Sequence, residues 1–301
     1  MKNMNKYENC LLCPRKCGIN RGIGQTGVCG VSSEIKVARA ALHYWEEPCI
    51  SGKRGSGAVF FSGCSLHCVF CQNRAISDGK EGKVISKERL SDIFIELADK
   101  GANNINLVTP GQYIPDIVWA VNDAKSRGMK LPIIYNTSGY ENVTELKLLE
   151  GIVDVYLPDF KYMDNMLSAK YSRAKDYPSV AKQALSEMVR QQPDVVIDDA
   201  TGLIQKGVIV RQLLLPGHVN DAKVVLKYLY DTYHDHVYLS MMSQFTPIAL
   251  KDYPEINRTV TRREYERLVD YAIKIGITNA FIQEGDVAKD SFIPAFDCEG
   301  V

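Results

Sequence analysis

The sequence predicts an α/β protein built on a mainly parallel sheet. From residue 58 onward, short apolar segments typical of strands alternate with longer segments of helical periodicity. Ser86 suits a helix N-cap, and glycines stand where helix C′ residues are expected, at Gly101, Gly128 and Gly276. Alternating strands and helices build a parallel sheet with right-handed crossovers, either as an open doubly wound sheet or as a (β/α) barrel.

The expected strands and helices can be assigned to residue ranges. The expected strands are 58–63, 104–109, 132–138, 154–160, 208–217, 236–245 and 279–284. The expected helices are 86–101, 114–128, 142–150, 220–233 and 261–275, with Asn220 as a further N-cap. The segment 161–207 departs from this alternation, and it predicts one or two surface helices followed by a small β-ribbon that turns around 199–202.

Composition limits the function classes. The 301 residues are 46% hydrophobic, which is enough for a sizeable core. Lys+Arg and Asp+Glu both number 36, so no overall basic field indicates a nucleic-acid partner. We expect no secretory signal and no membrane partner, because no apolar run is long enough. Nine clustered cysteines indicate metal binding in a reducing cytoplasm rather than disulfides.

The most informative motif is C-x3-C-x2-C, formed by Cys64, Cys68 and Cys71 directly after the apolar run 58–61. Three thiolates from one loop cover one face of an Fe–S cube and leave one iron open for a small molecule. A zinc site or three structural thiols are the alternatives, but zinc loops favour paired C-x2-C modules that close four ligands. We therefore predict a [4Fe–4S] cluster here.

A second cysteine group lies near the N-terminus, with the spacing C-x2-C-x3-C-x11-C at Cys10, Cys13, Cys17 and Cys29. Four thiolates suit tetrahedral zinc or a second Fe–S cluster, and the spacing alone leaves both open. Cys49 and Cys298 are isolated, so we expect packed thiols. The predicted domains are a cysteine-rich metal-binding segment, 1–50, and a main domain, 51–301, with 162–207 as an insertion.

The Cys64 loop resembles that of the radical SAM superfamily. The resemblance includes Gly63 before the first cysteine, Phe70 before the third and Gln-Asn after it. The stretches 46–52, 55–64 and 243–247 and the pair Gln283-Glu284 are similar to the pyruvate formate-lyase activating enzyme-like branch, which also carries N-terminal cysteines. The resemblance implies a partial (β/α)6 barrel open on one side, S-adenosylmethionine (SAM) as cofactor, and a one-electron donor such as flavodoxin or ferredoxin.

The resemblance also implies SAM-binding positions at the ends of successive strands. Where the activases have Gly-Gly-Glu, this chain reads Thr109-Pro110-Gly111-Gln112. In place of their Asp-Thr-Asn-Gly-like run, it reads Asn136-Thr137-Ser138-Gly139. Their Asp-x-Lys is matched by Asp159 and Lys161, their strand-5 arginine by Arg211, and their strand-6 histidine position holds Gln244; Phe70 completes the expected set. In the activases, two aspartates help to hold a monovalent cation. This chain keeps Asp159 but has Asn136 at the other position. Arg211 lies inside a strand that we expect to be buried. Its charge therefore requires a polar partner or a ligand.

The expected function is reductive cleavage of SAM to a 5′-deoxyadenosyl radical that abstracts a substrate hydrogen, as in a radical SAM oxidoreductase. An activase acting on a glycine of a partner protein is the leading form. Radical modification of a small metabolite, a peptide or RNA is the alternative. A non-catalytic Fe–S electron-transfer protein is the second alternative, although it would need none of the matches to SAM loops.

Overall fold

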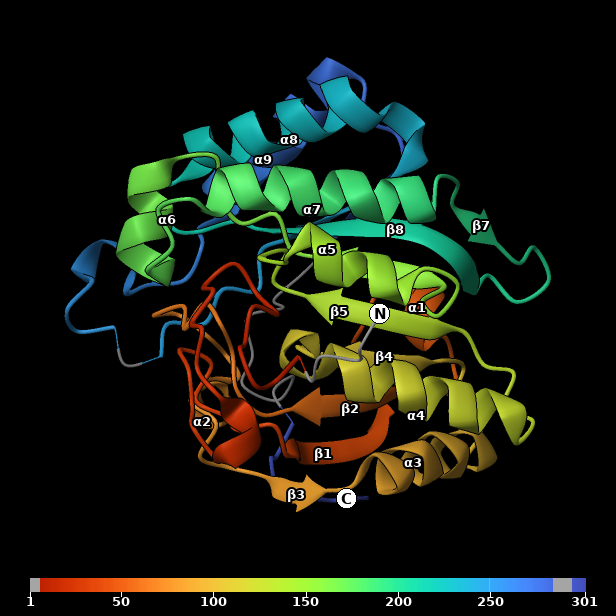
Figure 1. The fold of residues 1–301 in the computed structure, drawn as a ribbon. Helices are drawn as coiled ribbons and strands as arrows, with labels where there is room; N and C mark the ends of the chain where they lie inside the picture. Colours follow the sequence, from red (N-terminus) through yellow and green to blue (C-terminus); the bar gives the residue numbers. More distant parts are fainter. Residues whose placement is uncertain (1–5, 249, 284–293) are drawn as a thin grey trace.

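One curved sheet organises the molecule. The structure is a computed structural model that describes residues 6–248, 250–283 and 294–301. Its described strands are β1 (Ile35–His43), β2 (Ser56–Phe61), β3 (Lys83–Ile85), β4 (Ile105–Val108), β5 (Ile133–Thr137), β6 (Val155–Pro158), β7 (Val196–Ile197), β8 (Ile204–Leu213), β9 (Tyr238–Met242) and β10 (Ala280–Ile282). The strand order is β10-β9-β8-β6-β5-β4-β2-β1-β3, and all neighbours from β10 to β2 pair in parallel (Figure 1). The predicted α/β partial barrel is confirmed.

Helices connect most of the parallel strands. They are α1 (Pro48–Ser51), α2 (Arg74–Ser77), α3 (Lys87–Asp99), α4 (Ile114–Ser126), α5 (Val143–Leu146), α6 (Asn165–Ser172), α7 (Tyr177–Gln191), α8 (Val219–Tyr233) and α9 (Arg262–Ile275). The predicted cap is confirmed at Ser86, whose hydroxyl accepts the Arg89 N–H at 3.1 Å. The Asn220 cap is wrong: α8 already begins at Val219, so His218 takes the N-cap position.

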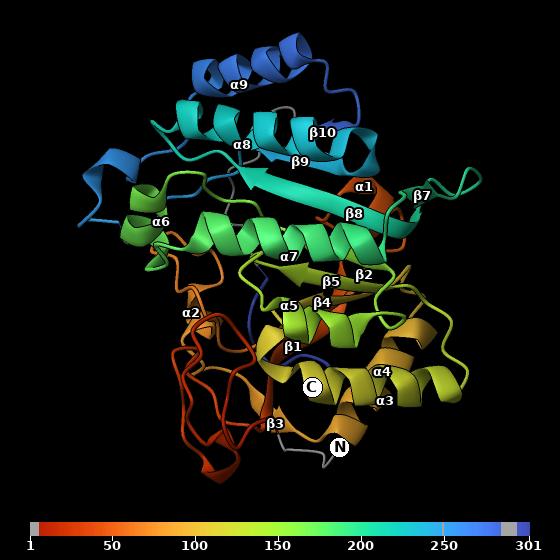
Figure 2. The ribbon, with the colours of Figure 1, turned by 45° about the horizontal axis from the view of Figure 1, so that its top comes forward.

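Side chains alternate between the two faces of the sheet because strands have a two-residue period. On the outer face, Val59, Leu107 and Tyr135 pack in the large apolar core that includes the helices. On the inner face, Cys49 and Ile50 of α1 pack with Ile134 in a smaller core. Figure 2 shows the helices α7, α8 and α9 over the half of the sheet that contains β8 and β9.

The segment 161–207 folds as expected from its composition. Helices α6 and α7 form there, and the short strand β7 pairs antiparallel with β8 across a turn at 198–202. The helical and β-ribbon prediction is therefore confirmed. Figure 1 shows α7 running along β8 on the outside of the sheet.

The sequence did not reveal β1 and β3. Residues of the predicted N-terminal segment form β1, which pairs antiparallel with β2 and β3 and extends the main sheet. The C-terminal residues run along β1: the Ala40 N–H donates to the Glu299 carbonyl at 2.8 Å, and the Cys298 N–H donates to the Ala38 carbonyl at 3.0 Å. Glu284, at the end of the last predicted strand, lies outside the described residues. No described helix has the length and apolarity needed to span a bilayer.

Candidate active site

The Cys64–Cys71 loop begins where β2 ends, at the carboxyl edge of the sheet. Gly63 has a φ of +90°, which glycine adopts at little cost, and its N–H donates to the Ile76 carbonyl at 2.8 Å. A turn closes between Cys68 and Cys71, whose N–H donates to the Cys68 carbonyl at 3.1 Å. The Ser172 hydroxyl donates to the Cys68 Sγ at 2.9 Å. Hydrogen bonds to Ile76 and from Ser172 therefore fix the loop just before its first cysteine and at its second.

The three thiols of this loop are half-buried, and the Cys71 thiol interacts electrostatically with those of Cys64 and Cys68. Burial, with Cys64 and Cys68 as neighbours, raises the pKa of the Cys71 thiol to about 12. Burial also raises the pKa of the Cys68 thiol, although Lys161 opposes this. Three thiols grouped in one loop fit the ligand set of an Fe–S cluster. Because the ligands must be thiolates, binding would release protons from these side chains.

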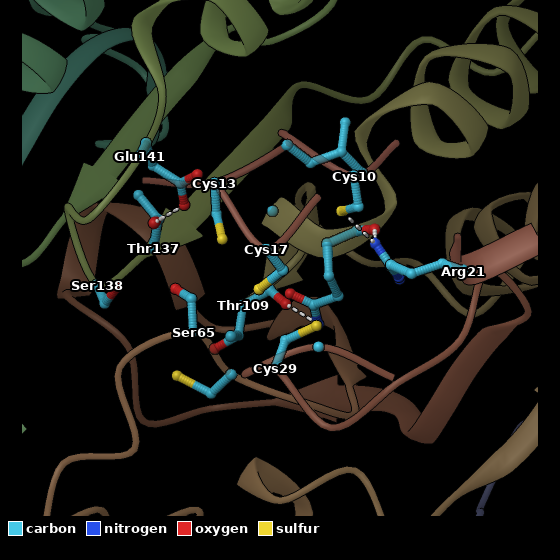
Figure 3. Close-up of a pocket in the computed structure, with 15 residues that line it drawn as sticks. Cys10, Cys13, Cys17, Arg21, Cys29, Ser65, Thr109, Thr137, Ser138 and Glu141 are labelled. Atoms are coloured by element: carbon cyan, nitrogen blue, oxygen red, sulfur yellow. Dashed lines mark hydrogen bonds between the residues drawn. The ribbon is translucent and has the colours of Figure 1, made fainter. Parts of the chain in front are cut away.

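Predicted SAM-binding residues meet Cys64 in one pocket. Thr109 follows β4, and Ser138 follows β5; both line the pocket (Figure 3), together with Gly111 and Cys64. Thr109 has a φ of +56°, an unusual value for a β-branched residue. Such strain concentrates at functional sites, so this strand end is a good candidate for ligand contact.

Asn136 and Pro110 support this edge through their backbones. The Asn136 carbonyl accepts the Thr109 N–H at 2.9 Å, which joins the ends of β4 and β5. The Pro110 carbonyl accepts the Tyr113 N–H at 2.9 Å and closes a 3-10 turn. Both residues therefore fix the shape of the strand end that carries Thr109.

Phe70 and Gln244 lie on segments that contact each other. The ring of Phe70 packs 5.7 Å from that of Phe245, measured between centroids. The Gln72 amide donates to the Gln244 carbonyl at 2.9 Å. The Gln244 side-chain oxygen accepts a hydrogen bond from the Gln283 amide at 3.1 Å. The end of β9 is thereby held against the cysteine loop.

Asp159 and Lys161 form a tight pair after β6. Their carboxylate and ammonium groups are 2.5 Å apart and largely shielded from solvent. Burial would lower the pKa of Lys161, but Asp159 and then Cys68 outweigh it and hold that pKa above its ordinary value. The Tyr177 hydroxyl accepts the Lys161 N–H at 3.0 Å and donates to the Ser138 carbonyl at 2.9 Å. Lys161 thus carries a positive charge near Cys68.

Arg211 meets two carboxylates inside the barrel. Its Nε donates to Glu47 Oε1 at 2.8 Å, and its Nη2 pairs with Glu46 and Glu47. The Asn106 amide donates to Glu46 Oε1 at 2.8 Å. Burial opposes ionisation, yet Arg211 keeps the pKa of Glu47 below its ordinary value. The polar partner expected for Arg211 is therefore this pair of glutamates.

The N-terminal cysteines lie beside the Cys64 loop. Cys10, Cys13, Cys17 and Cys29 line the same pocket as Cys64, and Figure 3 shows their side chains around it. The Cys64 N–H donates to the Cys29 carbonyl at 3.2 Å. Four thiols around one pocket have the chemistry that zinc or an Fe–S cluster requires. Within the described ranges, no three His, Cys, Asp or Glu side chains are gathered as closely as a single metal ion would need.

Arg21 and Glu141 are charged pocket residues that the sequence prediction missed, and Gln112 of the run 109–112 also lines the pocket. Glu141 accepts a hydrogen bond from the Thr137 hydroxyl, and burial raises the pKa of its carboxyl group to about 7 in spite of that bond. Its position four residues after the end of β5 was the available signal, because polar residues after parallel strands face the ligand edge. Arg21 had no comparable signal.

Comparisons with known proteins agree with this geometry. A family model described as a 4Fe-4S single cluster domain matches residues 51–183 and therefore includes Cys64, Cys68 and Cys71. An uncharacterized protein of Methanocaldococcus jannaschii, MJ0674, is 28% identical over 281 residues, which are 91% of this chain and 77% of the relative.

Among solved structures, a radical SAM methyltransferase from Sphaerobacter thermophilus is 15% identical with a TM-score of 0.51, covering 76% of this chain and 66% of its own. SuiB of Streptococcus suis, solved with S-adenosylmethionine, is 13% identical with a TM-score of 0.49, covering 74% of this chain and 48% of its own. The chain thus spans about half the length of SuiB. In fold, this protein is similar to the solved radical SAM methyltransferase, and residues 51–183 match a 4Fe-4S single cluster domain.

Proposed function

We propose that this protein is a radical SAM enzyme whose [4Fe–4S] cluster is held by Cys64, Cys68 and Cys71. One observation carries the proposal: Cys64 shares a pocket with Thr109, Gly111 and Ser138, which follow neighbouring parallel strands. Ligands of such sheets bind at this edge, because the loops after the strands converge there.

When bound, the cluster would supply one electron for the cleavage of SAM to methionine and a 5′-deoxyadenosyl radical, and that radical would take a hydrogen atom from the substrate. The residues of the chain bind SAM and orient it. Thr109 and Ser138 offer hydroxyl groups to the polar end of SAM, and Lys161 places its positive charge beside the thiolate of Cys68. Thr109, Ser138 and Lys161 are each half-buried, which limits the access of water to the reacting atoms.

The finer parts of the proposal rest on the resemblance to the activases. The electron donor is a flavodoxin or ferredoxin, the target is a glycine of a partner protein, and Cys10, Cys13, Cys17 and Cys29 hold zinc or a second Fe–S cluster. A formal net charge of zero favours a protein or a small molecule over nucleic acid as the substrate.

The test of the chemistry is anaerobic reconstitution with iron and sulfide, reduction in the presence of SAM, and measurement of 5′-deoxyadenosine. We expect the Cys64→Ala/Cys68→Ala/Cys71→Ala variant to form none. Cys298→Ala is the matched control, because Cys298 lies in the C-terminal segment along β1 and should leave product formation unchanged. Product at the wild-type rate from the triple variant would refute the assignment.

The test of the substrate class is electron paramagnetic resonance. A glycyl-radical protein mixed with reduced enzyme and SAM should give a glycine-centred doublet. If such partners give no doublet while a metabolite or peptide multiplies the 5′-deoxyadenosine yield, the activase role is wrong and the radical SAM chemistry stands.

A further inference from the structure

Arg21 is a buried cation in the N-terminal cysteine segment. Its side chain is 1% exposed and lines the pocket with the four cysteines. The guanidinium donates to the backbone carbonyls of Val31 at 3.2 Å, Ser32 at 2.5 Å and Gln112 at 2.8 Å. It also contacts the Cys10 Sγ at 3.8 Å (Figure 3). Three neutral oxygens and one sulfur therefore surround the charge.

These contacts solvate the charge without neutralising it. Burying a cation costs several kcal/mol unless an anion compensates it. The ring of Tyr7 lies 4.9 Å from the guanidinium carbon and that of Tyr113 5.7 Å, which adds cation–π attraction. Asp116 acts on Arg21 only at longer range and accepts a hydrogen bond from the Tyr7 hydroxyl. The buried charge thus calls for an anion close to Cys10.

The cysteine thiolates can supply that anion. Arg21 interacts electrostatically with both Cys10 and Cys29. A site of four thiolates around a divalent ion or an Fe–S cluster carries a net negative charge. A fixed cation against one of its sulfurs stabilises the thiolate form, as outer partners of metal ligands commonly do. The orientation of Arg21 therefore suits a loaded metal site.

Gln112 fixes this cation relative to the second cysteine group. Its carbonyl holds Arg21, and its side-chain amide donates to the carbonyls of Ser62 at 2.9 Å, Gly63 at 3.1 Å and Thr109 at 2.9 Å. These carbonyls belong to the strand end and loop that lead to Cys64 and to the predicted SAM edge. Arg21 is consequently held by the framework of the active site as well as by its own segment.

We propose that Arg21 is the positioned counter-charge of the N-terminal cysteine site: its guanidinium stabilises the thiolates that hold an Fe–S cluster there. The inference rests on the proposed metal site at Cys10, Cys13, Cys17 and Cys29. Arg21 acts through Cys10 and Cys29, so it is a positioning residue and not a ligand.

The experiment isolates this site in the full chain carrying Cys64→Ala, Cys68→Ala and Cys71→Ala. Zinc and iron per chain are measured after anaerobic purification, and their release is then followed in excess chelator from pH 6 to pH 9. In this background, we expect Arg21→Gln to release metal at least tenfold faster and to shift the retention profile to higher pH. Arg21→Lys keeps the positive charge but loses the planar guanidinium group. Its rate of metal release should therefore lie between those of the background protein and of Arg21→Gln.

Arg15→Gln is the matched control. Arg15 lies on the same segment and donates to the carbonyls of Ser65 at 2.8 Å and Arg173 at 2.7 Å, so its loss also weakens the packing of the segment. We expect its release rate to stay within twofold of the background. Equal acceleration by Arg15→Gln and Arg21→Gln, with no shift in the pH profile and no rescue by lysine, would overturn the inference alone. A background protein without bound metal would overturn the N-terminal metal site together with the inference, and would leave the Cys64 chemistry standing.

If Arg21→Gln fails to fold, the rates of metal release from Arg21→Lys and Arg15→Gln are compared instead. Faster release from Arg21→Lys than from Arg15→Gln supports the role of the guanidinium, and equal rates contradict it.

Discussion

At the scale of a single residue, burial changes the pKa of the Glu141 carboxyl group. Its folded-state pKa of about 7 lies above the ordinary value of 4.5, because burial disfavours the charged form. A raised pKa means that the folded state binds a proton more tightly than the unfolded state. The stabilisation is complete below pH 4.5 and is lost as the pH rises through 7, by an amount on the order of 3 kcal/mol.

We therefore predict that Glu141→Gln increases the free energy of unfolding at pH 8 by ~2–3 kcal/mol and changes it much less near pH 5. Denaturant titrations at the two pH values measure this. Glu150→Gln is the control, since Glu150 has a 56% exposed side chain and pairs at the surface with Arg190. Parallel pH profiles for the wild type and Glu141→Gln would show that this carboxyl group does not titrate as the burial predicts.

At the scale of elements, the contact between the N-terminal segment and the Cys64 loop is unusually close. A Cβ at Gly63 would stand 2.6 Å from the Cys29 carbonyl oxygen and 2.9 Å from a methyl group of Val31, in a backbone conformation with positive φ. Only glycine allows these two cysteine segments to pack at this distance.

Gly63→Ala should therefore separate the two segments. We expect a loss of more than ~1 kcal/mol in unfolding free energy, together with a lower iron content after reconstitution. Gly128→Ala is the matched control: Gly128 also has a positive φ (+102°), but an alanine Cβ there would meet no described atom within 4 Å, so this variant isolates backbone strain. If both variants lose the same stability and Gly63→Ala keeps its iron, the close packing does not support the cluster loop.

Sequence patterns predicted the elements that carry local signals. The apolar run at 58–63 and the cysteines after it are contiguous, so β2 and its loop could be placed together. β1 was missed because its sequence IKVARAALH is rich in alanine, and it forms by antiparallel pairing with β2. The pocket joins residues distant in the sequence, such as Arg21 and Glu141, and no spacing rule connects them. Arg211 was an intermediate case: its charge predicted a partner, but only the fold identifies Glu46 and Glu47.

At the scale of the whole molecule, the buried ion pairs of Arg211 with Glu46 and Glu47 connect opposite parts of the barrel. Glu46 and Glu47 lie between β1 and α1, Arg211 lies on β8, and Asn106 on β4 holds Glu46. The side chains of all three charged residues are at most 12% exposed. Removing the cation would leave two carboxylates buried without a counter-charge, which is far more costly than losing an exposed pair.

Arg211→Met should therefore cost ~3–5 kcal/mol of unfolding free energy, and adding Glu46→Gln and Glu47→Gln should recover most of it. Arg190→Met, which removes an exposed pair with Glu150, should cost ~1 kcal/mol or less. Denaturation curves measure both, and a loss no greater for Arg211→Met than for Arg190→Met would contradict the buried network. SAM binding to the recovered triple variant then separates two roles: restored affinity means that Arg211 serves the barrel alone, whereas affinity that stays lost means that the guanidinium also contacts SAM.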